Sequence, residues 1–295
     1  MTDDGDRRLK PVTDDLRLET ALPEGDTIFR TARALQDALA GGVVTRFHSV
    51  FPALTRVAYD RPIVGRTIES VASRGKHLLM TFSGDLVLRT HMRMFGSWQV
   101  YQPGARWRRP ARDMRVLVET VDAVAVGFTV PVAEFLTARQ LARHPELRAL
   151  GPDLLGEGFD DLEVAKRIRE RSTALIGDVL LNQRVMAGVG NVFKSEVLFV
   201  AAVDPFAPVS SLSEAQIARI VAVAREQLAA NVLGRTQTLS PAFGRRTTRS
   251  LDPREKLWVY GRGGGPCRRC GSKIEAKKTG IDARLTYWCP RCQER

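Results

Sequence analysis

The chain has 295 residues, of which 44% are hydrophobic, and a formal net charge of +12. This length accommodates two globular domains and a smaller module. No apolar stretch reaches the length that crosses a bilayer, which argues against a membrane protein, and the positive charge favours a polyanionic partner.

The first twenty-one residues carry six acidic and four basic side chains and no apolar core. They therefore lack the pattern of a signal peptide. We expect residues 1–22 to be a disordered extension or a misassigned start, and the protein to be cytoplasmic.

The pattern from Asp26 onward is helical. Ile28, Ala32, Leu35 and Leu39 recur at spacings of four, three and four residues, Asp26 can cap the helix, and two glycines at 41–42 end it. Strand patterns separated by turns follow at 43–50, 67–72, 78–82, 86–89, 98–101, 114–120 and 123–130. This order predicts an antiparallel β-sandwich with a flanking helix over residues 23–144.

The composition changes after residue 144. Proline and glycine residues mark a linker over 145–159, and helical periods follow at 161–171, 174–185, 192–200 and 212–232. Ser211 and Glu214 have the spacing of a capping box before the last helix. A helical domain over 160–256 is therefore expected, and residues 233–254 form its loop.

A glycine-rich turn, Gly188-Val189-Gly190-Asn191, lies between two of these helices. Asn191 falls where a helix N-cap is expected, and free backbone N–H groups at a helix start bind anions. The turn could therefore hold a phosphate on Gly190 and Asn191. Taken alone, the same residues also fit an ordinary interhelical turn.

All four cysteines lie in residues 257–295, as Cys267-x-x-Cys270, eighteen intervening residues and Cys289-x-x-Cys292. Two such pairs at this separation predict a four-thiolate zinc ribbon, in which each pair supplies half of a tetrahedron. Four cysteines leave no open coordination position, so we expect one structural zinc and no catalytic metal. Two disulfides or free thiols are the alternatives.

The C-terminal part carries most of the positive charge. Residues 241–295 contain fourteen Lys and Arg against five Asp and Glu, a net charge of +9. A compact basic ribbon is typical of a surface that binds a phosphate backbone. A solvated positive face without a partner is the alternative.

Five ordered motifs give the chain a family resemblance. They are PEGDT at 23–27, SRGKHLL at 73–79, HMRMFGSW at 91–98, LNQRVMAGVGNVFKSEVLF at 181–199, and the ribbon sequence WVYGRGGGPCRRCGSKI with TYWCPRCQ. Together they resemble the formamidopyrimidine-DNA glycosylase and endonuclease VIII family, closest to its endonuclease VIII-like members. The resemblance spans residues 23–293. It implies an α+β multidomain fold with an N-terminal β-sandwich, a helix–two-turns–helix domain and a C-terminal zinc ribbon.

The resemblance also implies a bifunctional DNA glycosylase and abasic-site lyase that removes oxidised bases. Its nucleophile is the secondary amine of an N-terminal proline, here Pro23, which condenses with the sugar C1′ to a charged iminium, an electron sink. Glu24 matches the family's acid/base carboxylate, and Lys76 matches its catalytic lysine in the β-lobe. A helix-initiating proline and a solvated hairpin lysine are the alternatives.

The same resemblance assigns residues that hold damaged or abasic DNA. A base that leaves the stack opens a gap that side chains must fill. Arg93, Met94 and Phe95 occupy the family's intercalation loop, although Met94 and Phe95 could instead be core residues of a strand. Arg284 matches the zinc-finger arginine that contacts the lesion phosphates, and Asn191 matches its partner in the helix turn. We expect double-stranded DNA to be the partner of a monomeric, nucleoid-associated bacterial protein.

Three departures from the family pattern bear on substrate and activity. Asp26 and Thr27 stand where a second glutamate is frequent, and residues 233–257 lack the segment that caps an oxidised guanine; both favour oxidised pyrimidines. Pro23 is preceded by twenty-two residues, and an internal proline nitrogen is an amide with no lone pair to offer. We therefore expect the natural start at codon 22, because a leucine codon can serve as an initiator.

Two other functions fit the same residues. One is a catalytically silent, zinc-containing DNA-binding protein of this fold. The other is a formamidopyrimidine-DNA glycosylase that acts on oxidised purines.

Overall fold

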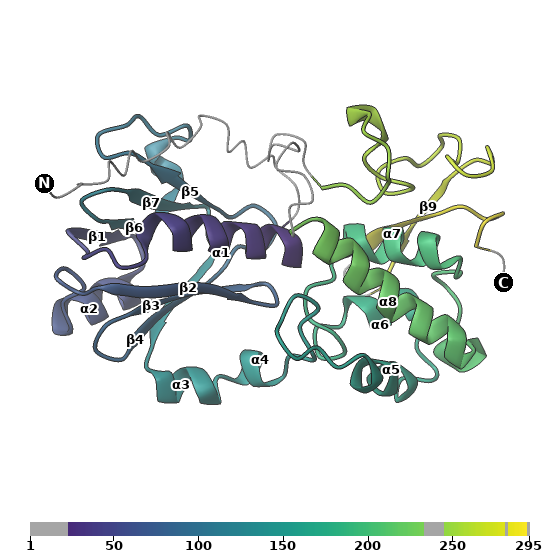
Figure 1. Ribbon diagram of the computed structural model, residues 1–295, viewed down its shortest axis with the longest axis horizontal. Coiled ribbons are helices and arrows are strands. Elements are labelled where there is room, and N and C mark those ends of the chain that lie inside the picture. Colours follow the sequence, from purple (N-terminus) through teal and green to yellow (C-terminus); the bar gives the residue numbers. More distant parts are fainter. Residues whose placement is uncertain (1–22, 233–244, 281–282, 294–295) are drawn as a thin grey trace, which may run out of the picture.

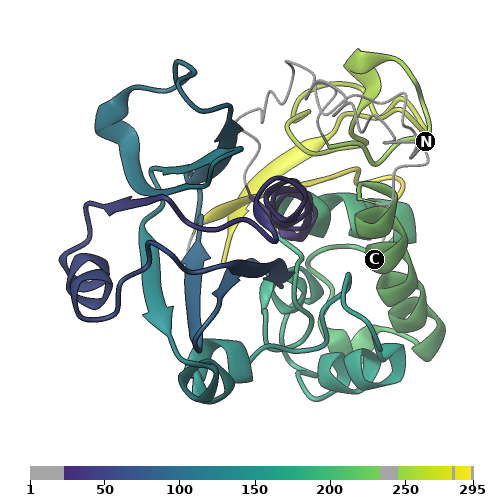
Figure 2. The ribbon, with the colours of Figure 1, turned by 60° about the vertical axis from the view of Figure 1, so that its left-hand side comes forward.

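The computed structural model describes residues 23–232, 245–280 and 283–293 (Figure 1). A first lobe rich in strands leads into a helical lobe and then into a small ribbon. Figure 2 shows the two lobes side by side, with helix α1 (Gly25–Leu39) at their junction. Within the described residues, no helix is both long enough and apolar enough to cross a membrane.

The first lobe is a sandwich of two four-stranded antiparallel sheets, with strand orders β1-β6-β7-β5 and β2-β3-β4-β8. The strands are β1 (Arg46–Ser49), β2 (Ile68–Arg74), β3 (His77–Phe82), β4 (Leu86–His91), β5 (Ser97–Tyr101), β6 (Met114–Glu119), β7 (Val124–Phe128) and β8 (Val132–Leu136). Ile28 and Leu35 of α1 share one core with Met80 of β3 and Val118 of β6. The expected sandwich with a flanking helix is thus confirmed.

Some elements of this lobe and of the following linker differ from the expectation. Helix α2 (Pro52–Asp60) separates β1 from β2, where only a turn was expected; Leu54 is buried, and Val57 and Ala58 pack against the core at helical spacing, a signal that the strand interpretation overlooked. Strand β8 was missed because Thr129, at φ 51°, breaks the chain after β7. Two short helices, α3 (Ala138–Arg143) and α4 (Pro145–Arg148), occupy the end of the sandwich segment and the start of the expected linker.

The helical lobe packs its helices around one apolar core that includes Ile168, Leu180, Val197 and Ile217. Its helices are α5 (Asp161–Arg169), α6 (Ile176–Leu181), α7 (Asn191–Ala201) and α8 (Glu214–Ala230). The capping box of α8 is formed by Ser213 and Gln216, each side chain bonding the other's backbone N–H. The box expected from Ser211 and Glu214 was therefore placed two residues too early.

The C-terminal ribbon consists of two cysteine turns and the antiparallel pair β9 (Glu275–Thr279) and β10 (Arg284–Trp288). Its small core contains Cys267, Cys289, Val259 and Ile274, together with Phe199 from α7. Because Phe199 belongs to this core, helix α7 joins the helical lobe to the ribbon.

Candidate active site and DNA-binding surface

Glu24, the residue before helix α1, lies at the start of helix α7 in the other lobe. Its carboxylate accepts hydrogen bonds from the backbone N–H groups of Gly190 (3.1 Å), Val192 (2.7 Å) and Phe193 (3.2 Å). The first N–H groups of a helix have no intrahelical partner and attract negative charge. Glu24 is buried, so the helical lobe fixes the carboxylate, and Pro23 lies half-buried directly before it.

Glycine allows the two lobes to touch at this point. The N–H of Gly25 donates to the carbonyl oxygen of Gly188 at 2.9 Å, and a Cβ on Gly25 would lie 2.8 Å from the Gly188 Cα. A Cβ on Gly190 would lie 2.3 Å from the Cδ of Glu24. The glycines of the turn are therefore required by the close approach of Glu24 and of the α1 start.

Lys76, at the tip of the β2–β3 hairpin, reaches the same turn. Its Nζ donates to the carbonyl oxygen of Val189 at 2.6 Å, and the Gln183 side-chain amide donates to that oxygen at 2.9 Å. Burial lowers the pKa of Lys76 to about 8, and the negative charge of Glu24 opposes part of this shift. Glu24 and Lys76 thus come from two separate motifs and both bond to one turn of the helical lobe, and Pro23 directly precedes Glu24.

Asp26 does not cap helix α1 as expected. The helix begins after Glu24, which makes no side-chain cap bond, and Asp26 is buried in the first turn beside Arg245. Arg245 donates to both carboxylate oxygens of Asp26, at 2.6 Å from Nη2 and 3.0 Å from Nε. Burial alone would raise the pKa of Asp26, but Arg245 holds that pKa below its usual value. Sequence reasoning missed Arg245, because nothing local marks a partner 219 residues away.

Arg93, Met94 and Phe95 form an exposed turn between β4 and β5. Met94 is 59% exposed and Phe95 73% exposed, so the alternative that they are strand core residues is wrong. Arg93 has a φ of 51°, and the N–H of Gly96 donates to the carbonyl oxygen of Met92 at 2.9 Å. A Cβ on Gly96 would lie 2.5 Å from that oxygen, so glycine closes a turn that presents its three preceding side chains outward.

The helix–turn residues lie somewhat differently from the sequence expectation. The N-cap of α7 is Gly190 and Asn191 is the first helical residue. The Gly190 N–H is bonded to Glu24 instead of being free for a phosphate. Asn191 donates from Nδ2 to the carbonyl oxygen of Leu285 at 2.8 Å, and Leu285 follows the exposed Arg284 in β10. Asn191 therefore ties the start of α7 to the strand that carries Arg284.

The four cysteines converge on one point of the ribbon. Their Sγ atoms all lie within 4.8 Å of one another, with Cys267 and Cys292 3.9 Å apart and Cys270 and Cys289 3.5 Å apart. A tetrahedral zinc with four bonds of about 2.3 Å holds its sulfur ligands about 3.8 Å apart. The four thiols are free of disulfides and fit a structural zinc.

A second buried carboxylate, Glu196 of α7, holds the neck of the ribbon. It accepts hydrogen bonds from the backbone N–H groups of Trp258 (2.7 Å), Val259 (2.9 Å) and Tyr260 (2.7 Å), and from the Thr247 hydroxyl. In the sequence, Glu196 is the one acidic residue of α7 and is followed by five apolar residues, at 197–201. One helix thus receives Glu24 at its start and anchors the ribbon at its middle.

Three family models match the chain in order. They describe the formamidopyrimidine-DNA glycosylase N-terminal domain at residues 22–131, the formamidopyrimidine-DNA glycosylase H2TH domain at residues 150–240, and a zinc finger found in FPG and IleRS at residues 264–295. The matches therefore include the sandwich strands β1 to β7, the turn at 188–190 and the four cysteines.

Individual relatives agree with these matches. The chain is 41% identical over 275 residues to probable endonuclease 8 2 of Streptomyces coelicolor, covering 92% of this chain and 94% of the relative. It is 38% identical to the DNA-(apurinic or apyrimidinic site) lyase Nei2 of Mycolicibacterium smegmatis, covering 92% and 99%. A solved structure of Lactococcus lactis Fpg with DNA containing an abasic site matches with a TM-score of 0.76 and 26% identity, covering 92% and 100%. The chain belongs to the formamidopyrimidine-DNA glycosylase and endonuclease VIII family of DNA glycosylases and abasic-site lyases.

Proposed function

We propose that this protein excises oxidised pyrimidines from duplex DNA and cleaves the resulting abasic site, with Pro23 as its nucleophile. The observation that carries this proposal is that Glu24 and Lys76 both bond to the turn at 188–190, with Pro23 directly before Glu24. The pyrimidine preference draws on relatives named endonuclease 8, among them the Escherichia coli protein at 32% identity over 92% of this chain. The segment that carried the sequence argument for pyrimidines lies partly outside the described residues, at 233–244.

The chemistry follows from the properties of a secondary amine. The Pro23 nitrogen donates its lone pair to C1′ while the damaged base leaves with the electrons of the glycosidic bond and takes up a proton. The sugar ring then opens as O4′ is protonated and the amine proton is lost, which leaves an iminium between Pro23 and C1′. Loss of a C2′ proton expels the 3′ phosphate, and water finally hydrolyses the iminium to release the amine.

Glu24 and Lys76 have complementary parts in this sequence. The Glu24 carboxylate is next to Pro23 and is held by the start of α7, so it can exchange a proton at the sugar ring oxygen from a fixed position. Lys76 has a pKa of about 8, so both its charged and neutral forms are populated near neutral pH, which suits proton transfer at the reacting sugar.

The exposed residues hold the DNA. Arg93, Met94 and Phe95 present a guanidinium, a thioether and a ring that can fill the gap left by a flipped nucleotide. Arg284 contacts phosphates at the lesion, and Asn191 keeps the β10 strand against the start of α7. DNA is bound by a monomer in this scheme.

The first experiment tests the nucleophile. Attack by Pro23 requires a free amine, so the active protein begins at Pro23 after removal of an initiator residue at position 22. A chain that begins at Pro23 should be trapped by borohydride on an abasic duplex, whereas the 295-residue chain should not. Equal trapping of both chains would rule out Pro23 and direct attention to Lys76. Tight DNA binding without trapping by either chain would identify a silent binding protein.

The natural N-terminus is a separate measurement. Mass spectrometry of the protein isolated from its own cells should give a chain that begins at Pro23. A native chain that keeps residues 3–21 would contradict the proposed activation.

The second experiment tests the substrate. Duplexes that carry thymine glycol, 5-hydroxyuracil, 8-oxoguanine opposite cytosine, or a plain abasic site are compared under single-turnover conditions. We expect fast processing of the two pyrimidine lesions and the abasic site, and slow excision of 8-oxoguanine. Rapid 8-oxoguanine excision would instead assign the protein to the purine-repair branch of its family.

A further inference from the structure

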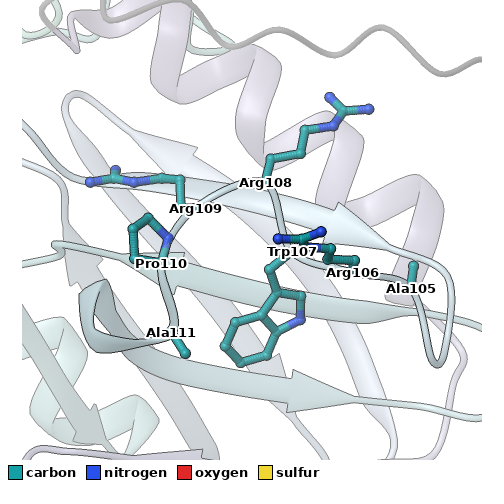
Figure 3. Close-up of a pocket in the computed structure, with 7 residues that line it drawn as sticks. All are labelled: Ala105, Arg106, Trp107, Arg108, Arg109, Pro110 and Ala111. Carbon is teal, nitrogen blue, oxygen red and sulfur yellow. The ribbon is translucent and has the colours of Figure 1, made fainter.

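An arginine-rich stretch joins β5 to β6 and has no part in the site described above. Residues 105–112, Ala-Arg-Trp-Arg-Arg-Pro-Ala-Arg, contain four arginines and no acidic residue. We call these eight residues the arginine segment. Residues 105–111 surround a hollow of about 570 Å³, shown in Figure 3.

Trp107 fastens the arginine segment to the sandwich. Its ring packs edge-on against Phe128 of β7, with centroids 5.7 Å apart, and lies against the cluster that also contains Tyr101. The Tyr101 hydroxyl accepts a hydrogen bond from the backbone N–H of Arg108 at 3.2 Å. In Figure 3 the Trp107 ring turns toward the sheet and the Arg108 side chain points away from it. The half-buried ring thus anchors a segment in which Arg106 and Arg108 are both exposed.

Arg109 places the arginine segment beside the Arg93–Phe95 turn. Its guanidinium donates to the Ser97 hydroxyl at 3.2 Å and to the Thr129 hydroxyl at 2.8 Å. Ser97 is two residues after Phe95 and opens β5. The end of the segment that carries Arg109 therefore lies near the turn whose side chains would fill the gap in the DNA.

The segment also lies on the side of the molecule where the ribbon lies. In both Figure 1 and Figure 2 the β5–β6 connection forms the upper edge of the sandwich lobe, and the chain leading into the ribbon forms the upper edge on the helical side. Helix α3 lies at the lower edge of the sandwich lobe in Figure 1. The arginine segment and the chain leading into the ribbon therefore lie on the same side in these views, opposite α3.

We propose that the arginine segment binds the phosphate backbone of the duplex beside the flipped base, beyond the nucleotides that the Arg93–Phe95 turn contacts. This inference rests on the proposed function, because it takes the Arg93–Phe95 turn as the point where the base leaves the stack. Arg106 and Arg108 make the phosphate contacts, and Trp107 holds them in place. The contacts carry no sequence information, so they lengthen the DNA footprint without changing the lesion preference.

The test compares two double variants of the full chain on a duplex with a stable abasic-site analogue, which needs no free Pro23 for binding. Arg106→Gln with Arg108→Gln removes two positive charges from the segment. Arg139→Gln with Arg143→Gln removes two from exposed positions of α3 and is the matched control. Affinity is measured by fluorescence anisotropy between 50 and 300 mM salt. We expect the first variant to bind about 10-fold more weakly at 0.15 M salt and to lose about 1.8 from the log–log salt slope, with the control unchanged.

Duplex design locates the contact. Two duplexes have the abasic analogue one base pair from one end or from the other, so each lacks the neighbouring phosphates on one side of the lesion. The loss of affinity in the Arg106→Gln and Arg108→Gln double variant should vanish on one of the two duplexes and persist on the other. Equal affinity of the segment variant, its control and the unchanged protein would overturn the inference, and so would a defect that survives on both duplexes.

A further variant distinguishes the loss of DNA contacts from a loss of stability of the sandwich lobe. Trp107→Ala should weaken binding as much as the arginine double variant while both keep the thermal stability of the sandwich lobe within a few degrees. Borohydride trapping at saturating DNA and low salt should be unchanged in all variants that begin at Pro23. Failure of trapping in the unchanged protein would count against the proposed function alone, because the binding comparison does not depend on it.

Discussion

Gly190→Ala tests whether the position of the Glu24 carboxylate determines base excision. Gly190 has ordinary extended backbone angles, φ −124° and ψ −161°, so alanine brings no backbone strain. The new Cβ would stand 2.3 Å from the Glu24 Cδ, whereas ordinary contact begins at 3.4 Å. The carboxylate must therefore move by about 3.4 − 2.3 = 1.1 Å, away from helix α7.

The magnitude follows from the hydrogen bonds that such a shift breaks. Glu24 accepts three of them, at 2.7 to 3.2 Å, and a displacement of about 1 Å takes them beyond useful length. Each hydrogen bond to a charged group contributes about 1.5–3 kcal/mol, part of which returning water recovers, so we expect a loss of about 3 kcal/mol in the free energy of unfolding. A catalytic group misplaced by about 1 Å costs about 100-fold in rate, which is the fall expected in single-turnover base excision.

The control is a double-mutant cycle with Glu24→Ala. Removing the Glu24 side chain removes the steric clash, so Gly190→Ala should cost little further stability in that background. Binding to an abasic analogue should stay within a few-fold in every variant. Additive stability losses, or excision within a few-fold of normal in a folded Gly190→Ala protein, would refute the idea that the turn positions Glu24.

Three further predictions concern pH, the ion pair and the metal. An α-amino group titrates near 7.7–8.0 and must be neutral to attack, while Lys76 loses its charge above a pKa of about 8, so activity should peak near pH 8. Lys76→Arg, if active, should keep activity on the alkaline side, and an unchanged alkaline fall would exclude Lys76 as its cause. Arg245→Met should lower the free energy of unfolding by about 3 kcal/mol because it leaves the buried Asp26 charge with only the longer contact to Arg30, at 3.5 Å. The depressed pKa of Asp26 stabilises the fold above pH 3.8 and this gain is lost as pH falls, so the variant's deficit should shrink in acid during urea titrations. Cys289→Ser should release zinc and weaken DNA binding while circular dichroism shows the sandwich still folded; retained zinc would contradict the four-cysteine site.

Local signals in the sequence were sufficient to predict much of this fold. The spacing of Cys267, Cys270, Cys289 and Cys292 is a short-range constraint of metal geometry, and the four sulfur atoms converge as expected. The apolar period of α1 was equally visible, because that helix buries one continuous face. Helix α2 was overlooked although Leu54, Val57 and Ala58 have helical spacing, because its nine residues give only a short pattern.

The polar contacts between the lobes could not be predicted from local patterns. Arg245 pairs with Asp26 across 219 residues, and Glu24 bonds to N–H groups 166 to 169 residues away. Almost every residue type has a backbone N–H group, so no sequence motif shows which N–H groups will bond to Glu24. Family resemblance assigned Glu24 a role, but only the structure shows what holds its carboxylate.

Several contacts between the lobes lie within a few residues of the proposed nucleophile. Glu24 bonds to the start of α7, Gly25 bonds to Gly188, and Lys76 bonds to Val189. Opening of the lobes would therefore move Glu24 and Lys76 away from the turn of the helical lobe that positions them. A sandwich lobe from one relative and a helical lobe from another would combine only if the turn of the helical lobe fitted the Glu24 and Lys76 positions of the sandwich lobe. The residues that carry the proposed chemistry and the residues that hold the two lobes together therefore have to change together in evolution.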